Sequence, residues 1–382
     1  MSAQGCLSRR FLLAAAVAAI ALWPAARAGA DEPVKIGAVE DLTGPTAKYG
    51  VAIRQGFELA AAEINAKSGV LGGRKLDLLF EDGAGSKEQS INAVKKLIGL
   101  DHVSAVLGPT LSNEMFAAAP FANERKTPII GTSTTATGIT DIGPWVFRTS
   151  LPEADVLPVT LQRAREKYGF DTVALMYSND DAFTKSGADV FKAALEKMGV
   201  KIATIETFAT KDTDFSPQLT KIKGLNVQAI VVSALAEAGA GLVLQARQLG
   251  IPKTVPIIGG NGFNSSKLPE IAGQAADGVI VGSPWFIGKA DAANQKFVAD
   301  FRAKYSTDPD QFAAQAYDTL YILAAALDRA KSTENTKLAE ALLQTDYAGV
   351  MGPFKFTPQR NPAETTGVVV LQVRDGKFQV LQ

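Results

Sequence analysis

The sequence contains one cysteine and one histidine in 382 residues, and this scarcity excludes several kinds of function. Cys6 precedes the first long apolar run, so it is misplaced for a lipid anchor and has no partner for a disulfide. His102 has no cysteine nearby and no second imidazole, which are the neighbours that a metal site or a nucleophilic site needs. We expect His102 to serve a surface or strand-start role.

Motifs of common enzyme classes are also missing. There is no GxxxxGK[ST] phosphate loop, and the segment 259–262 lacks the third glycine of a dinucleotide-binding fingerprint. The segment 131–135 lacks the second glycine of a nucleophile elbow. We therefore expect a protein that is not an enzyme, with no catalytic residue, no cofactor and no metal.

The sequence has no excess of either charge and only one long apolar run. Lys and Arg number 39 and so do Asp and Glu, which argues against a nucleic acid partner. Arg9 and Arg10 precede the run FLLAAAVAAIALW, which is too short for a transmembrane helix and is followed by small residues. We predict an export signal over residues 1–30, cleaved near Ala28 or Ala30, and a soluble periplasmic protein. The segment SRRFLL resembles a twin-arginine signal, but the export route stays open.

From Val34 onward, apolar runs of strand length alternate with amphipathic helical segments. The first series contains the strand-like runs VKIGAV, KLDLLFE, VSAVLG and TPIIG, and Ser86 with Gln89 predicts a capping box for one helix. The second series contains TVALMYS, VKIATIE, AIVVSAL, VPIIGG and GVIVGS, with helices expected near 182–198, 214–223 and 237–249. Two such series predict an α/β fold of two doubly wound parallel-sheet lobes.

The C-terminal part of the sequence has a different pattern. It predicts two long helices over about 291–305 and 311–330. Two apolar runs, TGVVVLQV and KFQVLQ, then flank Asp375-Gly376, which is a signal for a two-residue hairpin turn.

Two stretches, AVLGPTLSNE and TPIIGTSTTAT, change abruptly from apolar residues to hydroxyl-bearing ones. The first leads to Thr110, Ser112 and Asn113, and the second leads to Thr132–Thr135. Ligands of open α/β sheets bind beyond the carboxyl ends of the strands. Hydroxyls and free N–H groups at a helix start suit a carboxylate there. Each hydroxyl could instead be only a turn residue or a helix cap.

Several longer segments follow one another in an informative order. They are VKIGAVEDLTGPTAKYG, GFELAAAEINAKSGVLGGRKLDLLFED, DTDFSPQLTKIKG, LQARQLG and MGPFKF. In this order the chain resembles the periplasmic leucine/isoleucine/valine-binding protein family, the solute receptors of branched-chain amino acid-type importers. The resemblance implies the type I periplasmic binding protein fold, with a ligand cleft between two lobes that three crossovers join.

The resemblance also implies where the lobes begin and end. The crossovers would fall near 148–152, 283–285 and 352–354. Lobe 1 would then comprise residues 31–149 with 285–352, and lobe 2 residues 150–284 with 353–382.

The resemblance assigns roles to individual residues as well. Amino acid-binding members hold the ligand carboxylate on positions that fall here on Ser112 and on the loop Ser133, Thr134 and Thr135. The first-loop tyrosine of the family matches Tyr49. A cleft aromatic of the second lobe matches Phe183, where tyrosine is usual, and Phe312 matches an aromatic of a late helix in the first lobe.

The chain departs from the family at the position that binds the ligand ammonium. Asn261 stands where amino acid-binding members have a carboxylate, and an amide cannot neutralise a buried ammonium. Leu235 replaces a tyrosine that helps to hold the amino group. Glu237, two residues later, could take the missing role if the loop is shifted. The family's disulfide is also lost, because its cysteines fall on Ala84 and Leu111.

We therefore predict an exported solute-binding protein of an ABC importer that captures a small carboxylate by hinge closure. Aromatic acids fit best, because the rest of the ligand would lie among Tyr49, Phe183, Leu235 and either Trp285 or Phe286. The expected partners are this ligand and the membrane permease and ATPase subunits, and we expect a monomer. Branched-chain or other apolar amino acids remain an alternative ligand class, and a ligand sensor of the same fold remains an alternative function.

Overall fold

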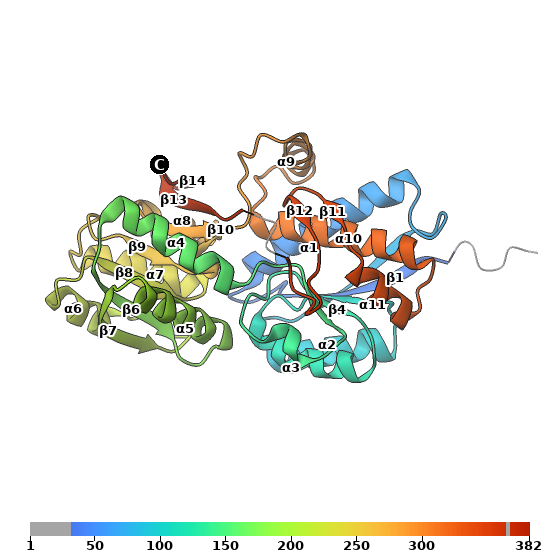
Figure 1. Cartoon of the computed structure of the whole chain (residues 1–382), viewed down its shortest axis with the longest axis horizontal. Helices are drawn as coiled ribbons and strands as arrows, with labels where there is room; N and C mark the ends of the chain where they lie inside the picture. The colour runs from blue at the N-terminus through green and yellow to red at the C-terminus, as the bar shows by residue number, and fades with distance from the viewer. Residues whose placement is uncertain (1–31, 364–366) are drawn as a thin grey trace, which may run out of the picture.

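The computed structural model describes residues 32–363 and 367–382, which form two α/β lobes side by side (Figure 1). The first lobe is built around a five-stranded parallel sheet of order β2-β1-β3-β4-β5. Its strands are β1 (Val34–Glu40), β2 (Leu76–Asp82), β3 (Val106–Leu107), β4 (Ile129–Gly131) and β5 (Val146–Arg148). The two-lobed α/β class predicted from the sequence is thus confirmed.

The second lobe is built around a seven-stranded sheet of order β14-β13-β10-β9-β8-β6-β7. Five strands are parallel: β6 (Thr172–Ser178), β7 (Lys201–Phe208), β8 (Ala229–Ser233), β9 (Ile257–Gly259) and β10 (Ile280–Ser283). The antiparallel strands β13 (Val369–Arg374) and β14 (Lys377–Val380) form the predicted hairpin at the sheet edge. Asp375 and Gly376 have φ of 51° and 72°, the left-handed values that a two-residue turn of this kind requires.

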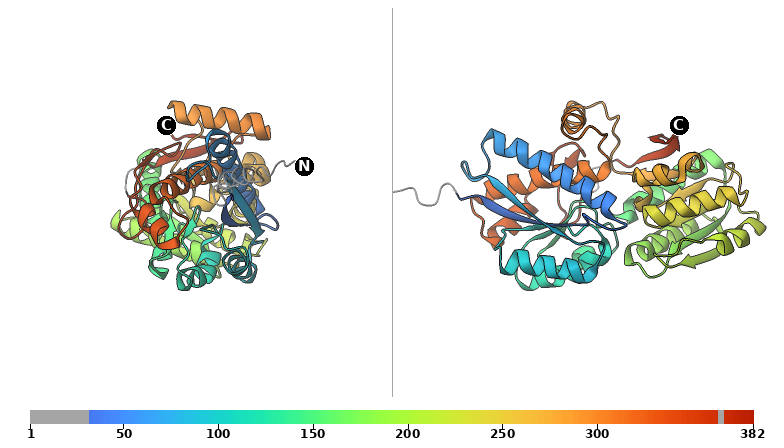
Figure 2. Two further views of the ribbon diagram at one scale, coloured as in Figure 1. Left: turned by 90° about the vertical axis from the view of Figure 1, so that its right-hand side faces the viewer. Right: turned by 180° about the vertical axis from the view of Figure 1, so that it is seen from behind.

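Helices cover both faces of each sheet (Figure 2). The first lobe carries α1 (Ala47–Lys67), α2 (Lys87–Gly99), α3 (Ser112–Glu124), α9 (Ala292–Tyr305), α10 (Gln311–Ala330) and α11 (Asn335–Leu343). The second lobe carries α4 (Glu153–Tyr168), α5 (Ala182–Lys197), α6 (Ser216–Gly224), α7 (Ala236–Gln248) and α8 (Lys267–Ala272). Short 3₁₀ turns lie at η1 (Ile139–Ile142), η2 (Asn261–Phe263) and η3 (Gly273–Ala276).

Helical spacing of apolar residues explains how these helices are buried. Ile53, Phe57 and Ile64 are buried on one face of α1, in the same core as the apolar face of α10. Ser86 caps α2 as predicted, because its Oγ accepts the Gln89 N–H at 3.4 Å. Within the described residues, no helix is both long enough and apolar enough to cross a membrane.

His102 lies on the surface, in a loop just before β3. Its φ of 57° is the left-handed value of a turn. This position agrees with the surface role expected from the sequence.

The third crossing between the lobes lies later than the expected position near 352–354. Phe354 and Phe356 are buried in the core of the first lobe, where Phe356 packs edge-to-face on Phe147 with ring centroids 5.5 Å apart. Arg360 donates to the carbonyls of Val146 and Thr140 in the same lobe. The chain therefore leaves the first lobe after this segment and reaches the second at β13. The remaining lobe boundaries stay a prediction.

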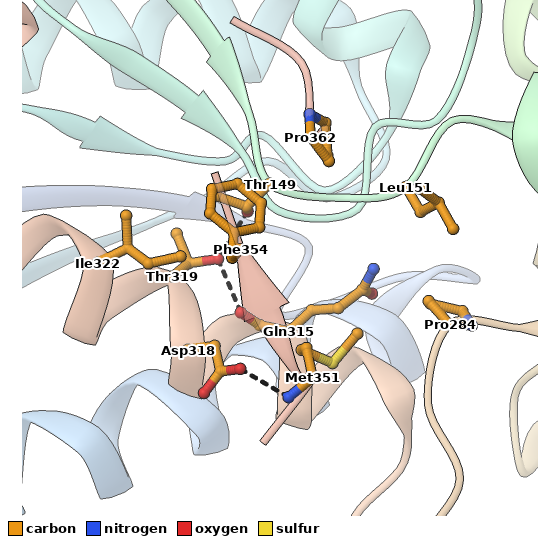
Figure 3. A pocket seen from close by; sticks show the side chains of 10 residues that line it. All are labelled: Thr149, Leu151, Pro284, Gln315, Asp318, Thr319, Ile322, Met351, Phe354 and Pro362. Atoms are coloured by element: carbon orange, nitrogen blue, oxygen red, sulfur yellow. Dashed lines mark hydrogen bonds between the residues drawn. The ribbon is translucent and has the colours of Figure 1, made fainter. Parts of the chain in front are cut away.

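A small cavity lies where the crossings meet, and we call it the hinge cavity (Figure 3). Its lining comes from the three crossing segments and from α10: Thr149, Leu151, Pro284, Gln315, Asp318, Thr319, Ile322, Met351, Phe354 and Pro362. The side chains of the crossings thus meet one face of α10.

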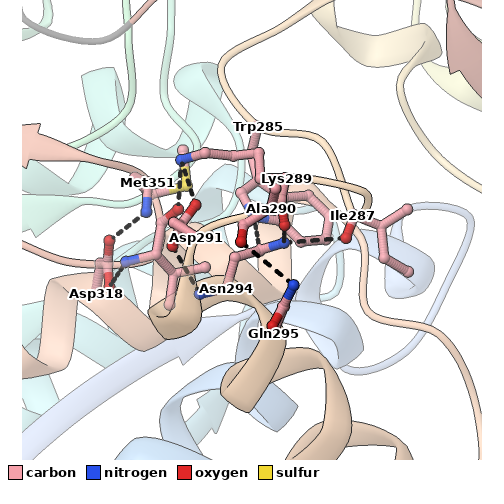
Figure 4. A network of polar contacts seen from close by, with 10 residues as sticks. Trp285, Ile287, Lys289, Ala290, Asp291, Asn294, Gln295, Asp318 and Met351 are labelled. Atoms are coloured by element: carbon pink, nitrogen blue, oxygen red, sulfur yellow. Dashed lines mark hydrogen bonds and ion pairs between the residues drawn. The ribbon is translucent and has the colours of Figure 1, made fainter.

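A polar network fixes the second crossing to the first lobe (Figure 4). Trp285 Nε1 donates to Asn294 Oδ1 at 2.8 Å, and Asn294 Nδ2 donates to the Ile287 carbonyl at 3.0 Å. Asp318 of α10 accepts the Met351 N–H at 2.7 Å, and burial raises the pKa of this carboxyl to about 6. These bonds attach the chain beside the hinge to α9 and α10.

Candidate functional site

A small pocket lies between the two lobes, and we call it the interlobe pocket. Ten residues line it: Tyr49, Thr110, Leu111, Ser112, Ser133, Phe183, Leu235, Asn261, Gly262 and Phe312. Seven of the nine ligand-binding residues predicted from the sequence are among them. The structure thus brings together side chains that the sequence separates by up to 263 positions.

The two predicted threonines, Thr134 and Thr135, do not line the interlobe pocket. Both are buried behind the loop, and their carbonyls bind the first crossing. The Thr134 carbonyl accepts from Ser150 Oγ at 3.1 Å, and the Thr135 carbonyl accepts the Glu153 N–H at 3.2 Å. Their position connects the pocket loop to the hinge.

The hydroxyls of Ser112 and Ser133 differ in whether their hydrogen is still available for a ligand. Ser112 Oγ accepts the Ala136 N–H at 3.3 Å, and its own hydrogen has no acceptor among the described residues, so it is free for a ligand. Ser133 Oγ donates to the Thr110 carbonyl at 2.6 Å and has thereby used its only hydrogen. Ser112 is therefore the free hydroxyl donor on the first-lobe side of the pocket.

Four helices begin at the interlobe pocket. Ser112 opens α3, Phe183 and Phe312 lie in the first turns of α5 and α10, and Leu235 precedes α7. The N-cap residues of α3 and α7 are Leu111 and Leu235, whose side chains cannot accept hydrogen bonds from the first-turn N–H groups. Uncapped N–H groups and the positive ends of helix dipoles favour an anion.

A buried acid close to this helix start carries little negative charge. Glu114 Oε2 accepts the Leu111 N–H at 3.0 Å. Burial and the neighbouring Asp41 raise the pKa of Glu114 to about 9. Glu114 is thus protonated at neutral pH and does not repel an anion at Ser112.

The second-lobe side of the pocket carries no charged side chain. Phe183 and Leu235 are apolar, and Asn261 is a neutral amide. Among the ten lining residues there is no Asp, Glu, Lys, Arg or His. Glu237 does not replace the missing carboxylate, because its side chain is 45% exposed and lies 3.9 Å from Lys267 Nζ.

Sequence reasoning missed Glu153, a buried acid beside Asn261. Glu153 Oε1 accepts the Asn261 N–H at 3.2 Å, and burial raises the pKa of this carboxyl to about 8. Glu153 does not line the pocket and is mostly neutral at pH 7, so it supplies no full counter-charge. Its only sequence signal is its place directly after Pro152 in the first crossing.

Hydrogen bonds across the cleft hold the lobes together around the pocket. Tyr49 Oη, on α1 of the first lobe, donates to the Gly262 carbonyl at 2.7 Å and accepts the Ala236 N–H at 2.8 Å. The Ala182 N–H of the second lobe donates to Asn113 Oδ1 at 2.8 Å. The structure is therefore a closed arrangement of the lobes.

Two aromatic residues expected near the ligand lie elsewhere. Trp285 and Phe286 line a separate groove between α1, the η2–α8 segment and the β13–β14 hairpin. The described residues also contain no cluster of His, Cys, Asp and Glu that could hold a metal ion.

Two lobes closed by hydrogen bonds over a small shared pocket define a two-lobed solute-binding protein. Residues 33–377 match the family model described as "Periplasmic binding protein", so the chain belongs to this family. It is a solute-binding protein of the ABC transporter type, not an enzyme. A small-molecule ligand and the permease and ATPase of an ABC transporter are the partners that this family implies.

Relatives agree with this assignment. A Leu/Ile/Val-binding protein of Rhizobium johnstonii is 29% identical over 342 residues, covering 88% of this chain and 89% of the relative. The branched-chain amino acid transporter substrate-binding protein LivJ of Streptococcus pneumoniae, solved with isoleucine, has a TM-score of 0.86 and 29% identity, covering 91% and 98% of the two chains. The resemblance to the leucine/isoleucine/valine-binding family is thus confirmed.

A more distant structure shares the fold. The ABC transporter solute-binding protein of R. palustris, solved in complex with benzoate, has a TM-score of 0.83 and 23% identity, covering 91% of this chain and 95% of that one. At this identity the likeness concerns the fold alone.

Proposed function

We propose that this protein captures a small carboxylate in the periplasm, an aromatic acid foremost, and delivers it to an ABC importer. The observation that carries the proposal is the contrast between the two sides of the interlobe pocket. The uncapped start of α3 and the free Ser112 hydroxyl face one side, while no charged side chain faces the other. A ligand with one negative charge and no positive charge matches this arrangement.

The remaining lining suits an aromatic ring. Tyr49 and Phe312 form an edge-to-face pair with centroids 4.9 Å apart, and Phe183 and Leu235 add apolar surface from the other lobe. Ring faces and edges pack favourably in such a setting. The benzoate complex of the R. palustris protein is a precedent for an aromatic acid in this fold.

An aliphatic amino acid is the second candidate, because the similar relatives are named for leucine, isoleucine and valine. Its ammonium would meet Asn261 in place of a carboxylate. Burying a cation without a counter-charge costs several kcal/mol, so we rank this ligand class second.

The same proposal includes three further predictions: the protein is exported, it is a monomer, and its remaining lobe boundaries lie where the sequence predicts them. The expected signal, with Arg9, Arg10 and a cleavage site near Ala28 or Ala30, lies outside the described residues. The family's periplasmic members support export. A sensor of the same fold would bind the same ligand, and loss of ligand uptake on deletion of the gene distinguishes the receptor from the sensor.

Thermal-shift measurements on the protein without its export signal test the ligand class. Benzoate and para-hydroxybenzoate are expected to raise the melting temperature by about 5 °C at a hundredfold excess over Kd, since ligands stabilise by mass action. Leucine and valine are expected to raise it much less. Strong stabilisation by leucine with none by either benzoate would contradict the aromatic-acid proposal.

A further inference from the structure

A relay of three buried amides crosses the cleft beside the interlobe pocket. Gln311, the first residue of α10 in the first lobe, lies between Asn264 and Asn261 of the second lobe. Asn264 Nδ2 donates to Gln311 Oε1 at 2.6 Å, and Gln311 Nε2 donates to Asn261 Oδ1 at 2.7 Å. All three side chains are at least nine-tenths buried.

This relay fixes which end of the Asn261 amide faces the ligand. Gln311 Oε1 accepts from Asn264 Nδ2, whereas the Ser283 hydroxyl, 3.2 Å from the same oxygen, gives its one hydrogen to the closer Trp285 carbonyl. Gln311 therefore turns its NH₂ group towards Asn261, and Asn261 must accept this hydrogen bond with its side-chain oxygen. Asn261 Nδ2 has no hydrogen-bond partner within the described residues, and Asn261 lines the pocket.

We propose that Gln311 is a specificity-determining residue that makes Asn261 present only N–H donors to the interlobe pocket. The pocket then selects carboxylates that carry a hydrogen-bond acceptor, such as a carbonyl or hydroxyl oxygen, at the Asn261 end. A ligand with an ammonium or another donor at that end leaves two donors facing each other in a buried site. The proposal rests on the proposed function as a carboxylate receptor and narrows its ligand class.

Gln311 itself does not line the pocket, so it is a positioning residue. Substitutions at two positions, Gln311 and Asn264, are expected to reverse the direction of the hydrogen bonds in the relay. In Gln311→Glu the introduced carboxylate accepts from both neighbours, so Asn261 turns its NH₂ to the relay and its oxygen to the pocket. In Asn264→Asp the change is made outside the pocket: the carboxylate accepts from Gln311 Nε2, which turns Gln311 over and then Asn261.

The test measures Kd by calorimetry for two pairs of probes. The aromatic pair is para-formylbenzoate, an acceptor, and para-aminobenzoate, a donor. The aliphatic pair is the keto acid of leucine and leucine itself. In whichever of the two pairs binds, the probe with the acceptor is expected to bind the natural protein at least about five-fold more tightly than the probe with the donor.

Both variants are expected to reverse this preference or to remove it. The matched control is Gln315→Glu, the same substitution one helical turn along α10, where the side chain lines the hinge cavity instead. This control is expected to keep the preference. Because Asn264→Asp alters a different residue, a folding defect in Gln311→Glu leaves the test intact.

The outcomes separate the two proposals. A preference that is unchanged in both variants, or a natural protein that prefers the donor probes, overturns the role of Gln311 while the carboxylate receptor stands. Failure of all four probes to bind overturns the carboxylate receptor, and the role of Gln311 with it.

Discussion

The two sides of the interlobe pocket are built from different chemistry. On the first-lobe side, Ser112 and the start of α3 offer hydrogen-bond donors that no capping side chain occupies. On the second-lobe side, Phe183 and Leu235 are apolar, and the one polar side chain, Asn261, is held by a residue of the opposite lobe. The donors on the first-lobe side are placed by residues close in sequence, whereas the orientation of Asn261 on the second-lobe side depends on closure of the two lobes.

This difference separates affinity for the carboxylate from choice among carboxylates. Helix starts and hydroxyls bind any carboxylate that reaches them, because they contact only that group. Discrimination then depends on what the second lobe offers to the rest of the ligand. Burial makes this choice strict, since an unpaired polar group in a closed pocket costs about 1–3 kcal/mol.

The largest expected effect comes from giving the second-lobe side a charge. Asn261→Asp keeps the shape of the side chain and its acceptor for Gln311 Nε2. Binding of benzoate is expected to weaken and binding of leucine to strengthen, so that the ratio of their Kd values changes by about a hundredfold, roughly 3 kcal/mol. Calorimetry with both ligands measures this ratio.

A carboxylate introduced at Gln315 is the control for this change. Gln315→Glu puts a carboxylate in the hinge cavity, so the Kd ratio should stay as in the natural protein. An equal change in both variants would mean that the charge acts at long range and that the two sides of the pocket are not distinct.

A smaller effect is expected from Glu153, which stabilises the second lobe only while protonated. Its pKa is raised from 4.5 to about 8 by burial, so its stabilising contribution is complete below pH 4.5 and is lost as the pH rises through 8. Between pH 6 and pH 9, the free energy of unfolding of the natural protein should fall by about 2 kcal/mol more than that of Glu153→Gln. Urea denaturation at several pH values measures this, and parallel pH profiles would refute the assignment.

The smallest effect distinguishes two serines on the first-lobe side. Ser112→Ala should weaken benzoate binding by about 1.5 kcal/mol, because its hydrogen is free for the ligand. Ser133→Ala should weaken it by less than about 0.5 kcal/mol, because its hydrogen is already donated to the Thr110 carbonyl. Equal losses of affinity in the two variants would show that both hydroxyls reach the ligand.

Most of the fold could be predicted because periodicity and turn chemistry are local. The face of α1 bearing Ile53 and Phe57, the Ser86 cap and the turn at Asp375-Gly376 all depend on residues close in sequence. The position of the third crossing could not be predicted in this way, because it depends on Phe356 packing against Phe147, more than 200 residues away. Short elements such as β5 also carry too few residues to show a period.

The same reasoning applies to the site. Strand-end hydroxyls and the family resemblance indicated the residues that line the pocket, yet Thr134 and Thr135 lie behind it. The sequence could not show that these two side chains point away from the pocket while Ser133 points into it, because side-chain direction changes from one residue to the next along an irregular loop. Gln311 and Glu153 were missed because each acts through a contact with Asn261, at least 50 positions away.

Leucine at the N-cap of α3 links solute capture to the stability of secondary structure. A carboxylate bound beside Ser112 occupies the place of a capping side chain, so it completes the start of α3. Binding should then slow amide-hydrogen exchange in the first turn of this helix. The solute thus becomes a structural part of the protein for as long as it stays bound.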